Sequence, residues 1–493
     1  MDPRMRYDDA ARETSDALAD WWASYILKDE TSHQIAEFLL KHHKYVDCPG
    51  DPLPVFDTLS TGAFNTALQM KFARSPGVII RFPLPGAIMF PEEKLRNEVA
   101  IMRLIRDQTT IPVPFVIHSG TKRESPAGLG PFIIMDTIEH TMDMVDKLKT
   151  PGRPNGERNI LDPNISIAEL QTMYKSLARI LISLSKLSYN SIGSLRQIDD
   201  FTWHVADRPL SLHLNELVRL GTLPCSKLPL PGTTFETASS YFDTLAELHI
   251  SHLISQRNDS IESTDDCRRK FIARLLFRRI VQDETLRAQW VTHENGPFPL
   301  WCDDFRPGNV LVDNDVNITG VVDWEFSYTA PVEFSHAPPW WLLLEKPEYW
   351  PQGLDDWCIE YEKRLDVFLV AMMECESEKE GERLGKSQTL ADAMRKSWAS
   401  GDFWIMYAAR NNFAFDAIYW SKIDKRFFGE TDSEDLGDVW KSRVHLLRPD
   451  EQEFIERQVV LKMEAMETRE LAWDADGLTL DAMELMMSTK GSS

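Results

Sequence analysis

The 493-residue sequence has few cysteines, no long apolar run and no excess of basic residues. Its six cysteines lie far apart and form no CxxC pair, which argues against a zinc site and a disulfide framework and favours a reducing compartment. No segment approaches the roughly 18 consecutive apolar residues of a membrane-spanning helix. The net charge of −23 disfavours binding to nucleic acid phosphates and to anionic membranes.

The first residues carry charges where a signal peptide requires an apolar stretch, so we expect a cytoplasmic protein with no membrane and no nucleic acid partner. Internal repeats and low-complexity tracts are not visible either. The sequence does contain ample core material, because 43% of its residues are hydrophobic. At about 150 residues per domain, the length allows roughly three compact units.

The first part of the chain combines helical and strand patterns. Apolar residues recur at helical spacing from residue 14 to about 44, with a break near 28–31, and predict a helical extension. Short turns then separate segments typical of an antiparallel meander. The predicted elements are strands at 55–59, 66–72 and 78–82, a helix at 92–106, and strands at 113–118 and 132–135.

From about residue 166 the pattern is mainly helical, after a loop rich in Pro, Gly and Asn at 150–164. The clearest elements are helices at 167–188, 404–420 and 450–466, interrupted by short strands at 299–301, 310–312 and 318–322. We therefore expect four segments. They are a helical N-terminal extension at 1–52, a small lobe at 53–139, a large lobe at 140–428, and C-terminal helices with a tail, frayed or a short acidic helix, at 429–493.

The most informative stretch lies between two short apolar strands. Asp304 precedes Asn309 by five residues, and Asp323 follows after a hairpin, nineteen residues beyond Asp304. In a kinase catalytic loop this spacing places a base beside the attacking hydroxyl, and an amide oxygen and a second carboxylate on magnesium. Each match alone is common in ordinary turns, but two matches bounded by strands in the expected order favour phosphotransfer chemistry.

Around these residues the sequence resembles the aminoglycoside phosphotransferase and choline kinase superfamily, particularly a fungal group of phosphotransferase-like proteins. The family carries His-Gly-Asp, an Asn after four more residues, and Ile-Asp-Trp. Here residues 302–304 are Cys-Asp-Asp, residue 309 is Asn and residues 322–324 are Val-Asp-Trp. The resemblance covers about residues 53–428. It implies a two-lobed α+β protein-kinase-like fold, with a small antiparallel-sheet lobe and a large, mainly helical lobe.

The resemblance also implies a chemistry, namely transfer of the γ-phosphoryl group of ATP or GTP to a hydroxyl of a small molecule with Mg²⁺. Asp304 would orient or deprotonate the acceptor hydroxyl, and Asn309 and Asp323 would bind the metal. The residues implied for nucleotide binding are Gly62, Ala63, Phe64, Arg81, Glu98, Asp136 and Ile138.

Three roles are expected of these nucleotide-binding residues. The loop at residues 60–65 would close over the phosphates, Arg81 held by Glu98 would clamp them, and the backbone of Asp136 and Ile138 would bind adenine. Each has a plainer interpretation. A hairpin turn, a surface ion pair and an apolar strand entering a loop would look the same.

Three residues depart from the family pattern. Arg81 replaces a Lys, so nucleotide binding is a safer prediction than turnover, because a guanidinium binds phosphate with a different shape. Cys302 replaces a His that braces the loop. Asp303 replaces a Gly and would either raise the pKa of the neighbouring Asp304 or, as we expect, point to solvent. The alternative is therefore a catalytically impaired kinase-like protein that binds nucleotide or acts as a scaffold. Glu325 would aid the metal site, pair with a base or be solvated.

The acceptor pocket is expected beyond Asp304, walled by helices from residues 166–292 and 340–420. Its candidate lining residues, which core packing would explain equally well, are Trp340, Trp341, Asp416 and Trp420. An acidic surface is compatible with a cationic acceptor such as an aminoglycoside or choline, but net charge does not identify a substrate. No Ala-Pro-Glu pattern follows Asp323, which disfavours a protein kinase.

Overall fold

The computed structural model describes residues 4–43, 52–154, 156–379, 389–431, 435–466 and 468–490. Cys48 and the end of the predicted N-terminal extension lie outside these ranges. The five cysteines within them form no disulfide. No helix in the described ranges combines the length and apolarity needed to cross a membrane.

The small lobe is built on a five-stranded antiparallel sheet, which confirms the predicted meander. Its strand order is β1-β2-β3-β5-β4. The strands are β1 (Val55–Thr61), β2 (Asn65–Lys71), β3 (Val78–Pro83), β4 (Val116–Gly120) and β5 (Phe132–Asp136). In this register Arg81 on the central strand β3 lies opposite Ala67 on β2 and Ile133 on β5. The two-residue alternation of strands places Arg81 on the same face as Ile79 and Ile133.

Helices cover both faces of this sheet. The helix α3 (Pro91–Gln108) packs with Ile133 and Met135 of β5 on one face. Leu68, Ile80 and Phe132 on the other face belong to a separate apolar cluster with α1 (Asp9–Ile26), α2 (Asp29–His43) and α18 (Gly477–Lys490). The N-terminal extension and the C-terminal tail therefore share the core of the small lobe.

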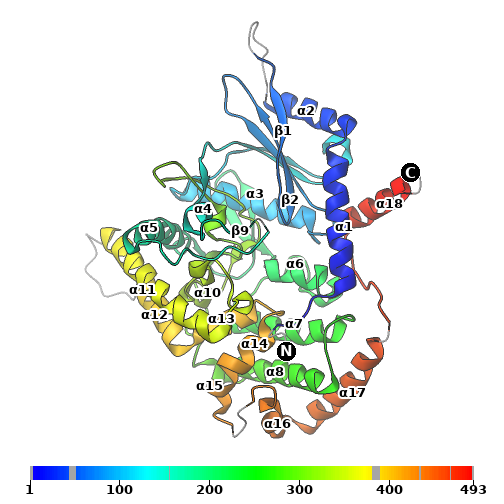
Figure 1. The fold of residues 1–493 in the computed structure, drawn as a ribbon, viewed down its shortest axis with the longest axis vertical. Helices are drawn as coiled ribbons and strands as arrows, with labels where there is room; N and C mark the ends of the chain where they lie inside the picture. Colours follow the sequence, from blue (N-terminus) through cyan, green and yellow to red (C-terminus); the bar gives the residue numbers. More distant parts are fainter. Residues whose placement is uncertain are drawn as a thin grey trace.

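The N-terminal segment also reaches the large lobe. Met5 is fully buried there, and its amide donates to the carbonyl of Phe413 at 2.8 Å. Figure 1 shows the N-terminus among the helices of the large lobe, and α1 running from there to the sheet beside α18.

The large lobe is mainly helical, as expected. Its principal helices are α5 (Ile167–Leu184), α6 (Leu212–Arg219), α7 (Ala238–Ser255), α8 (Thr264–Gln282), α11 (Leu354–Lys379), α12 (Leu390–Ser400), α13 (Asp402–Ala409) and α17 (Pro449–Ala465). Shorter helices are α4 (Met144–Leu148), α9 (Glu284–Arg287), α10 (Val332–His336), α14 (Phe415–Ile418), α15 (Asp424–Phe428) and α16 (Val439–Arg443). The single helix predicted at 404–420 is wrong, because the helix ends at Ala409 and a π-helix follows at Tyr419–Ile423.

Short strands flank the loop at residues 303–309, which is the expected catalytic loop. The strand β10 (Phe298–Cys302) pairs with β13 (Ser327–Thr329) and β7 (Ser188–Tyr189). After the loop, β11 (Val310–Val312) pairs with β12 (Ile318–Val321) and β6 (Met142–Asp143). A hairpin of β8 (Ser194–Asp199) and β9 (Thr202–Asp207) was not predicted from the sequence. The molecule has a two-lobed α+β protein-kinase-like fold.

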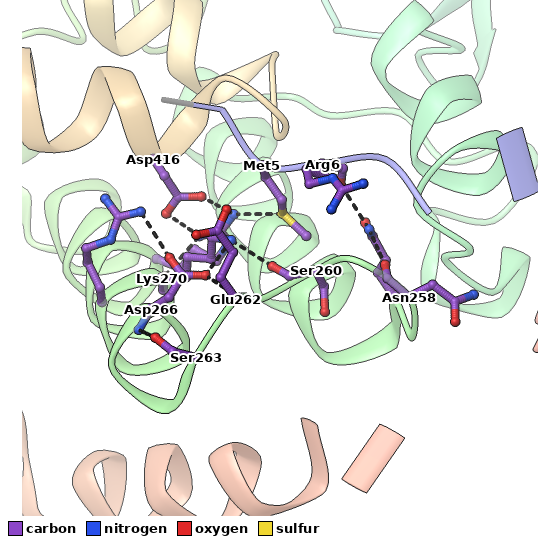
Figure 2. Close-up of polar contacts among 12 residues, drawn as sticks. Met5, Arg6, Asn258, Ser260, Glu262, Ser263, Asp266, Lys270 and Asp416 are labelled. Atoms are coloured by element: carbon purple, nitrogen blue, oxygen red, sulfur yellow. Dashed lines mark hydrogen bonds and ion pairs between the residues drawn. The ribbon is translucent and has the colours of Figure 1, made fainter. Parts of the chain in front are cut away.

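A group of buried charges in the large lobe, which we call the large-lobe polar cluster, consists of Asp266, Lys270, Arg274 and Asp416. Arg274 and Asp416 form an ion pair at 2.9 Å with side chains that are 0% and 1% exposed. Lys270 pairs with Asp266 at 2.8 Å. Figure 2 shows these contacts next to Met5 of the N-terminal segment. Asp416 is therefore part of the packing of this lobe, and its expected place in an acceptor pocket is wrong.

Candidate active site

A cleft of about 1370 Å³ brings together most of the residues expected to bind nucleotide and metal. Those that line it are Gly62, Ala63, Phe64, Arg81, Asp136, Ile138, Asp304 and Asp323. Glu98 and Asn309 lie behind this lining and contact it, as described below. Residues from the sheet, the loop between β5 and β6, and the catalytic loop thus meet although they are far apart in sequence.

The catalytic loop holds Asp304 at the large-lobe side of the cleft. The side-chain amide of Asn309 donates to the main-chain carbonyl of Asp304 at 2.8 Å. This bond uses the nitrogen of Asn309 and leaves its oxygen for another ligand. Arg306 Nε donates to Asp304 Oδ1 at 3.2 Å, and the Asp304 side chain is 16% exposed. The base candidate is thus fixed by its own loop and open on one side.

Asp323 follows β12 in the left-handed backbone conformation, with φ of +58°. Non-glycine residues adopt this conformation uncommonly, and such positions cluster at functional sites. Arg81 Nη1 donates to Asp323 Oδ1 at 2.6 Å, and 40% of the Asp323 side chain is exposed to the cleft. The second guanidinium nitrogen, Nη2, pairs with Glu98 of α3. The predicted Arg81–Glu98 pair therefore exists, and it is buried and extends to Asp323.

Sequence reasoning missed a second cation beside this pair. Lys94 lies one helical turn before Glu98 on α3 and is almost fully buried. Its ammonium group pairs with Glu325, and it donates to Asn65 Oδ1 at 2.7 Å. Asn65 Nδ2 donates to Glu325 Oε2 at 3.0 Å, which closes a triangle of contacts. The i, i+4 spacing of Lys94 and Glu98 on one helix face was the signal that could have identified Lys94.

The charges of the cleft shift the pKa values of its carboxyl groups. Burial raises the pKa of Asp304, while Arg306 opposes that shift. Burial by the surrounding protein also raises the pKa of Asp323 to about 6, against the effect of Arg81, although part of the side chain still faces the cleft. Burial alone would raise the pKa of Glu325 too, but Lys94 and Arg81 outweigh it and hold that pKa below its ordinary value. Glu325 therefore pairs with a base, which confirms one of its expected roles, and the alternative of a solvated Glu325 is wrong.

The expectation that Asp303 points to solvent is also wrong. Its side chain is 8% exposed and lies 3.6 Å from the guanidinium of Arg410. It accepts hydrogen bonds from Trp301 Nε1 at 2.7 Å and from the amide of Leu212 at 3.2 Å. The neighbouring Cys302 makes only a weak contact, from its thiol to the carbonyl of Glu325 at 3.7 Å. Asp303 therefore braces the loop where Cys302 contributes little.

The segment expected to bind adenine enters the cleft after β5. The amide of Asp136 donates to the carbonyl of Phe115 at 3.1 Å, so only the carbonyl of Asp136 remains to bind a base. The side chain of Ile138 packs on Gly320 of β12, where a Cβ atom would lie 2.4 Å from Ile138 Cδ1. Gly320 is therefore required for the close approach of this segment to β12.

The arrangement fits Mg²⁺ and a nucleotide. Arg81 contacts only Oδ1 of Asp323, and Asn309 keeps its oxygen, so two hard oxygen ligands are available at the cleft. No group of three or more His, Cys, Asp or Glu suited to a metal occurs within the described ranges. The other positions of a magnesium ion would then be filled by phosphate oxygens and water, as is usual for this ion. At Gly62 a Cβ would meet only Asn65 O, at 3.8 Å, so the space above the loop backbone is open to a ligand.

Charged and phenolic side chains gather on the far side of Asp304. Burial raises the pKa of Glu216 on α6, and the charges that act on this carboxyl include Lys346 and Asp304. The hydroxyl groups of Tyr7 and Tyr349 lie 2.8 Å apart. No described residue donates a hydrogen bond to the Glu216 carboxylate or pairs with it. This cluster, from α6, the segment after η4 (Trp340–Leu343) and the N-terminal segment, was not found from the sequence.

The tryptophans expected near an acceptor have different positions. Trp341 and Trp420 are buried in the core. Trp340 and Trp341 line a separate cavity of about 50 Å³ behind the catalytic loop, together with Asp303 and Arg410. Of these three tryptophans, Trp340 is the partly exposed one. Its ring lies next to the charged cluster, because Lys346 Nζ is 5.5 Å from the ring centroid.

The fold is that of the two-lobed, kinase-like phosphotransferase class. The sequence profile of the phosphotransferase enzyme family matches residues 65–335, and the chain belongs to this family. It is 26% identical over 338 residues to the clavilactone A biosynthesis cluster protein Y of Ampulloclitocybe clavipes, covering 64% of this chain and 70% of that protein.

Solved structures resemble the chain more distantly. An ethanolamine kinase of Plasmodium vivax shares 12% identity over 89% of this chain and 95% of that chain, with a TM-score of 0.41. A macrolide 2'-phosphotransferase type I shares 11% identity over 80% of this chain and 98% of that chain, with a TM-score of 0.37.

Proposed function

We propose that this protein transfers the γ-phosphoryl group of ATP or GTP to a hydroxyl of a small molecule, with Mg²⁺. One observation carries the proposal: Asp304, the free oxygen of Asn309 and Asp323 meet beside the same cleft, with Arg81 bound to Asp323. Membership of the phosphotransferase family supports it. The assignment to the cytoplasm stays a prediction.

Each residue has a role in this reaction. Asp304 accepts the proton of the acceptor hydroxyl or orients it, because it is the carboxylate of the catalytic loop that lines the cleft. Asn309 and Asp323 hold Mg²⁺, and Arg81 moves part of its hydrogen bonding from Asp323 to phosphate oxygens. When bound, the metal and nucleotide supply the phosphoryl group and neutralise its charge. The loop at 62–64 covers the phosphates with its backbone amides.

We place the acceptor between Asp304 and the cluster of Glu216, Lys346 and Tyr349. Part of this placement agrees with the expected walls, since these residues come from segments 166–292 and 340–420. Tyr7 of the N-terminal segment adds a wall from outside them. A carboxylate with no direct ion pair, next to the base, suits an acceptor that carries a donor or a positive charge near its hydroxyl.

The experiment is an untargeted screen in which a cell extract supplies acceptors and labelled ATP supplies the phosphoryl group. Wild type is compared with Asp323→Ala and with Glu216→Gln. We expect a labelled product with wild type, no product with Asp323→Ala, and a raised KM for the acceptor with Glu216→Gln. A product that forms equally with Asp323→Ala would reject the proposed function, and an unchanged KM with Glu216→Gln would reject the acceptor placement alone.

A second candidate function is nucleotide binding without turnover. It is favoured by the 2.6 Å contact of Arg81 with Asp323, because this contact occupies one of the two oxygens of a carboxylate expected to bind the metal. Calorimetry with MgATP and MgADP separates both candidates from a protein that binds no nucleotide. Slow hydrolysis of ATP, or any labelled acceptor in the screen, then separates an enzyme from a scaffold.

A further inference from the structure

The contacts of Asn65, Lys94 and Glu325 join the two lobes directly. Asn65 and Lys94 belong to the small lobe, and Glu325 follows Asp323 by two residues in the large lobe. Lys94 and Glu325 are both buried, with side chains 2% and 3% exposed. Each of the three side chains contacts the other two. The triangle is therefore a closed set of contacts across the cleft.

Lys94 does not reach the ligand space itself. It is absent from the residues that line the cleft, whereas Asn65 and Glu325 line it. A buried ion pair gives little net stability, because the desolvation of both charges offsets their attraction. The structural consequence of this pair is positional: Lys94 holds Asn65 and Glu325 in one arrangement.

Asn65 is also the end of the loop expected to cover the phosphates. The amide of Gly62 donates to the carbonyl of Asn65 at 2.9 Å, which closes the turn. Beside it, the rings of Phe64 and Phe326 lie 5.6 Å apart in an edge-to-face arrangement. Two successive residues of the small lobe, Phe64 and Asn65, thus contact two successive residues of the large lobe just beyond Asp323.

We propose that Asn65, Lys94 and Glu325 form a latch that positions the 62–64 loop over Asp323, so that the γ-phosphoryl group is aligned for transfer. The inference rests on the proposed function for its catalytic consequence. The latch itself is a property of the protein without ligand. All three are positioning residues, since they act through the loop and through the segment that carries Asp323.

The first test measures hydrogen exchange in the nucleotide-free protein. We expect the backbone amides of residues 62–65 to exchange about tenfold faster in Asn65→Ala and in Lys94→Met than in wild type, because the loop loses its anchor. In the double variant Asn65→Ala/Glu325→Ala, the same amides should exchange no faster than in the faster of the two single variants, Asn65→Ala and Glu325→Ala. Each single substitution already breaks the latch, so the two effects should not add. Asn65 is only partly buried, so Asn65→Ala tests the latch even if Lys94→Met does not fold.

Lys270→Met is the matched control for Lys94→Met. It removes another buried lysine that pairs with a buried carboxylate, Asp266, in the large-lobe polar cluster (Figure 2). A general loss of stability would affect both variants, but the loop amides should change in Lys94→Met alone. Equal exchange of these amides in wild type, Asn65→Ala and Lys94→Met would overturn the latch.

The second test separates alignment from affinity. In Asn65→Ala we expect the affinity for MgADP to stay within about threefold of wild type, and the turnover of MgATP to fall about tenfold or more, because the loop acts on the γ-phosphoryl group. Equal losses of MgADP affinity and of turnover would overturn the alignment role. Failure of wild type to bind MgADP would reject the proposed function, while the exchange measurement would still decide the latch.

Discussion

The molecule buries charge in two places, and the two differ in how the charges are paired. In the large-lobe polar cluster, each carboxylate has a direct cationic partner, and Arg274 and Asp416 are closed to solvent. In the cleft, three carboxylates, Glu98, Asp323 and Glu325, share two buried cations, Arg81 and Lys94. A fourth carboxylate, Asp304, pairs with Arg306, whose side chain is 49% exposed. The cleft therefore has negative charge left over, and the cluster does not.

The pKa values show the same difference. Burial by itself would raise the pKa of Asp416, but Arg274 and Lys270 outweigh it, so this pKa lies below its ordinary value. The pKa of Asp304 and that of Asp323 are both raised, because burial exceeds the effect of the available cations. Uncompensated carboxylates of this kind are typical of sites that bind a cation or move a proton. The comparison thus assigns stability to the cluster and chemistry to the cleft.

The largest expected effect comes from Asp304→Asn in the cleft. This variant removes the base without changing the size of the side chain, so we expect turnover to fall about 10²- to 10⁴-fold. The affinity for MgADP and the melting temperature should stay close to wild type, because no partner loses a required charge. Steady-state kinetics measures the turnover, and calorimetry measures the affinity for MgADP and the melting temperature. Retained turnover in Asp304→Asn would show that this carboxylate of the cleft does not act as the base, and the contrast between the cleft and the large-lobe polar cluster would fail.

Arg274→Met should have the opposite profile. It leaves Asp416 buried without its main cation, and breaking such a pair costs about 3–5 kcal/mol of unfolding free energy. Chemical denaturation measures this loss, and the double variant Arg274→Met/Asp416→Leu should recover part of it, since no charge is then left unpaired. The KM for MgATP should not change in the folded fraction. Full stability of the single variant would contradict the structural role of the cluster.

Addition of MgADP should stabilise the protein through the cleft. At a ligand concentration about 100 times Kd, binding to the folded state adds about 2.7 kcal/mol to the unfolding free energy. We expect the magnesium-dependent part of this gain to disappear in Asp323→Ala and to persist in Lys270→Met. Thermal unfolding with ADP alone and with MgADP measures it. If ADP alone and MgADP stabilise the wild-type protein equally, the carboxylates of the cleft do not bind the magnesium ion.

The smallest expected effect concerns a buried lysine that no carboxylate pairs with directly in the described structure. Lys462 of α17 donates to the carbonyl of Gln256, and burial lowers its pKa to about 7, from an ordinary value near 10.4. Above pH 7 the unfolded chain holds more protons at this group than the folded protein. Stability therefore rises with pH, by about 2 kcal/mol between pH 7 and 9.

Lys462→Met should remove that part of the pH dependence, measured as the difference in unfolding free energy between variant and wild type across this range. Lys270→Met should leave it in place. A parallel pH dependence in wild type and Lys462→Met would show that Lys462 stays charged in the fold. The lack of a carboxylate partner would then not explain the difference between Lys462 and Lys270.

Local patterns predicted much of the fold. The strands at 55–59, 66–72 and 78–82 follow from alternation and turn residues over a few positions, and the structure confirms them within one or two residues. The hairpin of β8 and β9 and the break after Ala409 were missed, because packing against α3 and against the rest of the large lobe decides them. The helical N-terminal residues were recognised, but their contact with both lobes was not.

Spacing along the chain was enough to predict the order of the candidate catalytic residues Asp304, Asn309 and Asp323, because short strands and tight turns convert such spacings directly into positions. The tertiary structure alone decided which charges are paired. Lys94 meets Glu325 and Arg81 meets Asp323 only when the two lobes close on each other, over separations of more than 200 residues. Burial of Asp303 and of Asp416 is likewise set by distant partners, Arg410 and Arg274. Whether a carboxylate is compensated depends on neighbours in space, and spacing along the chain carries no information about them.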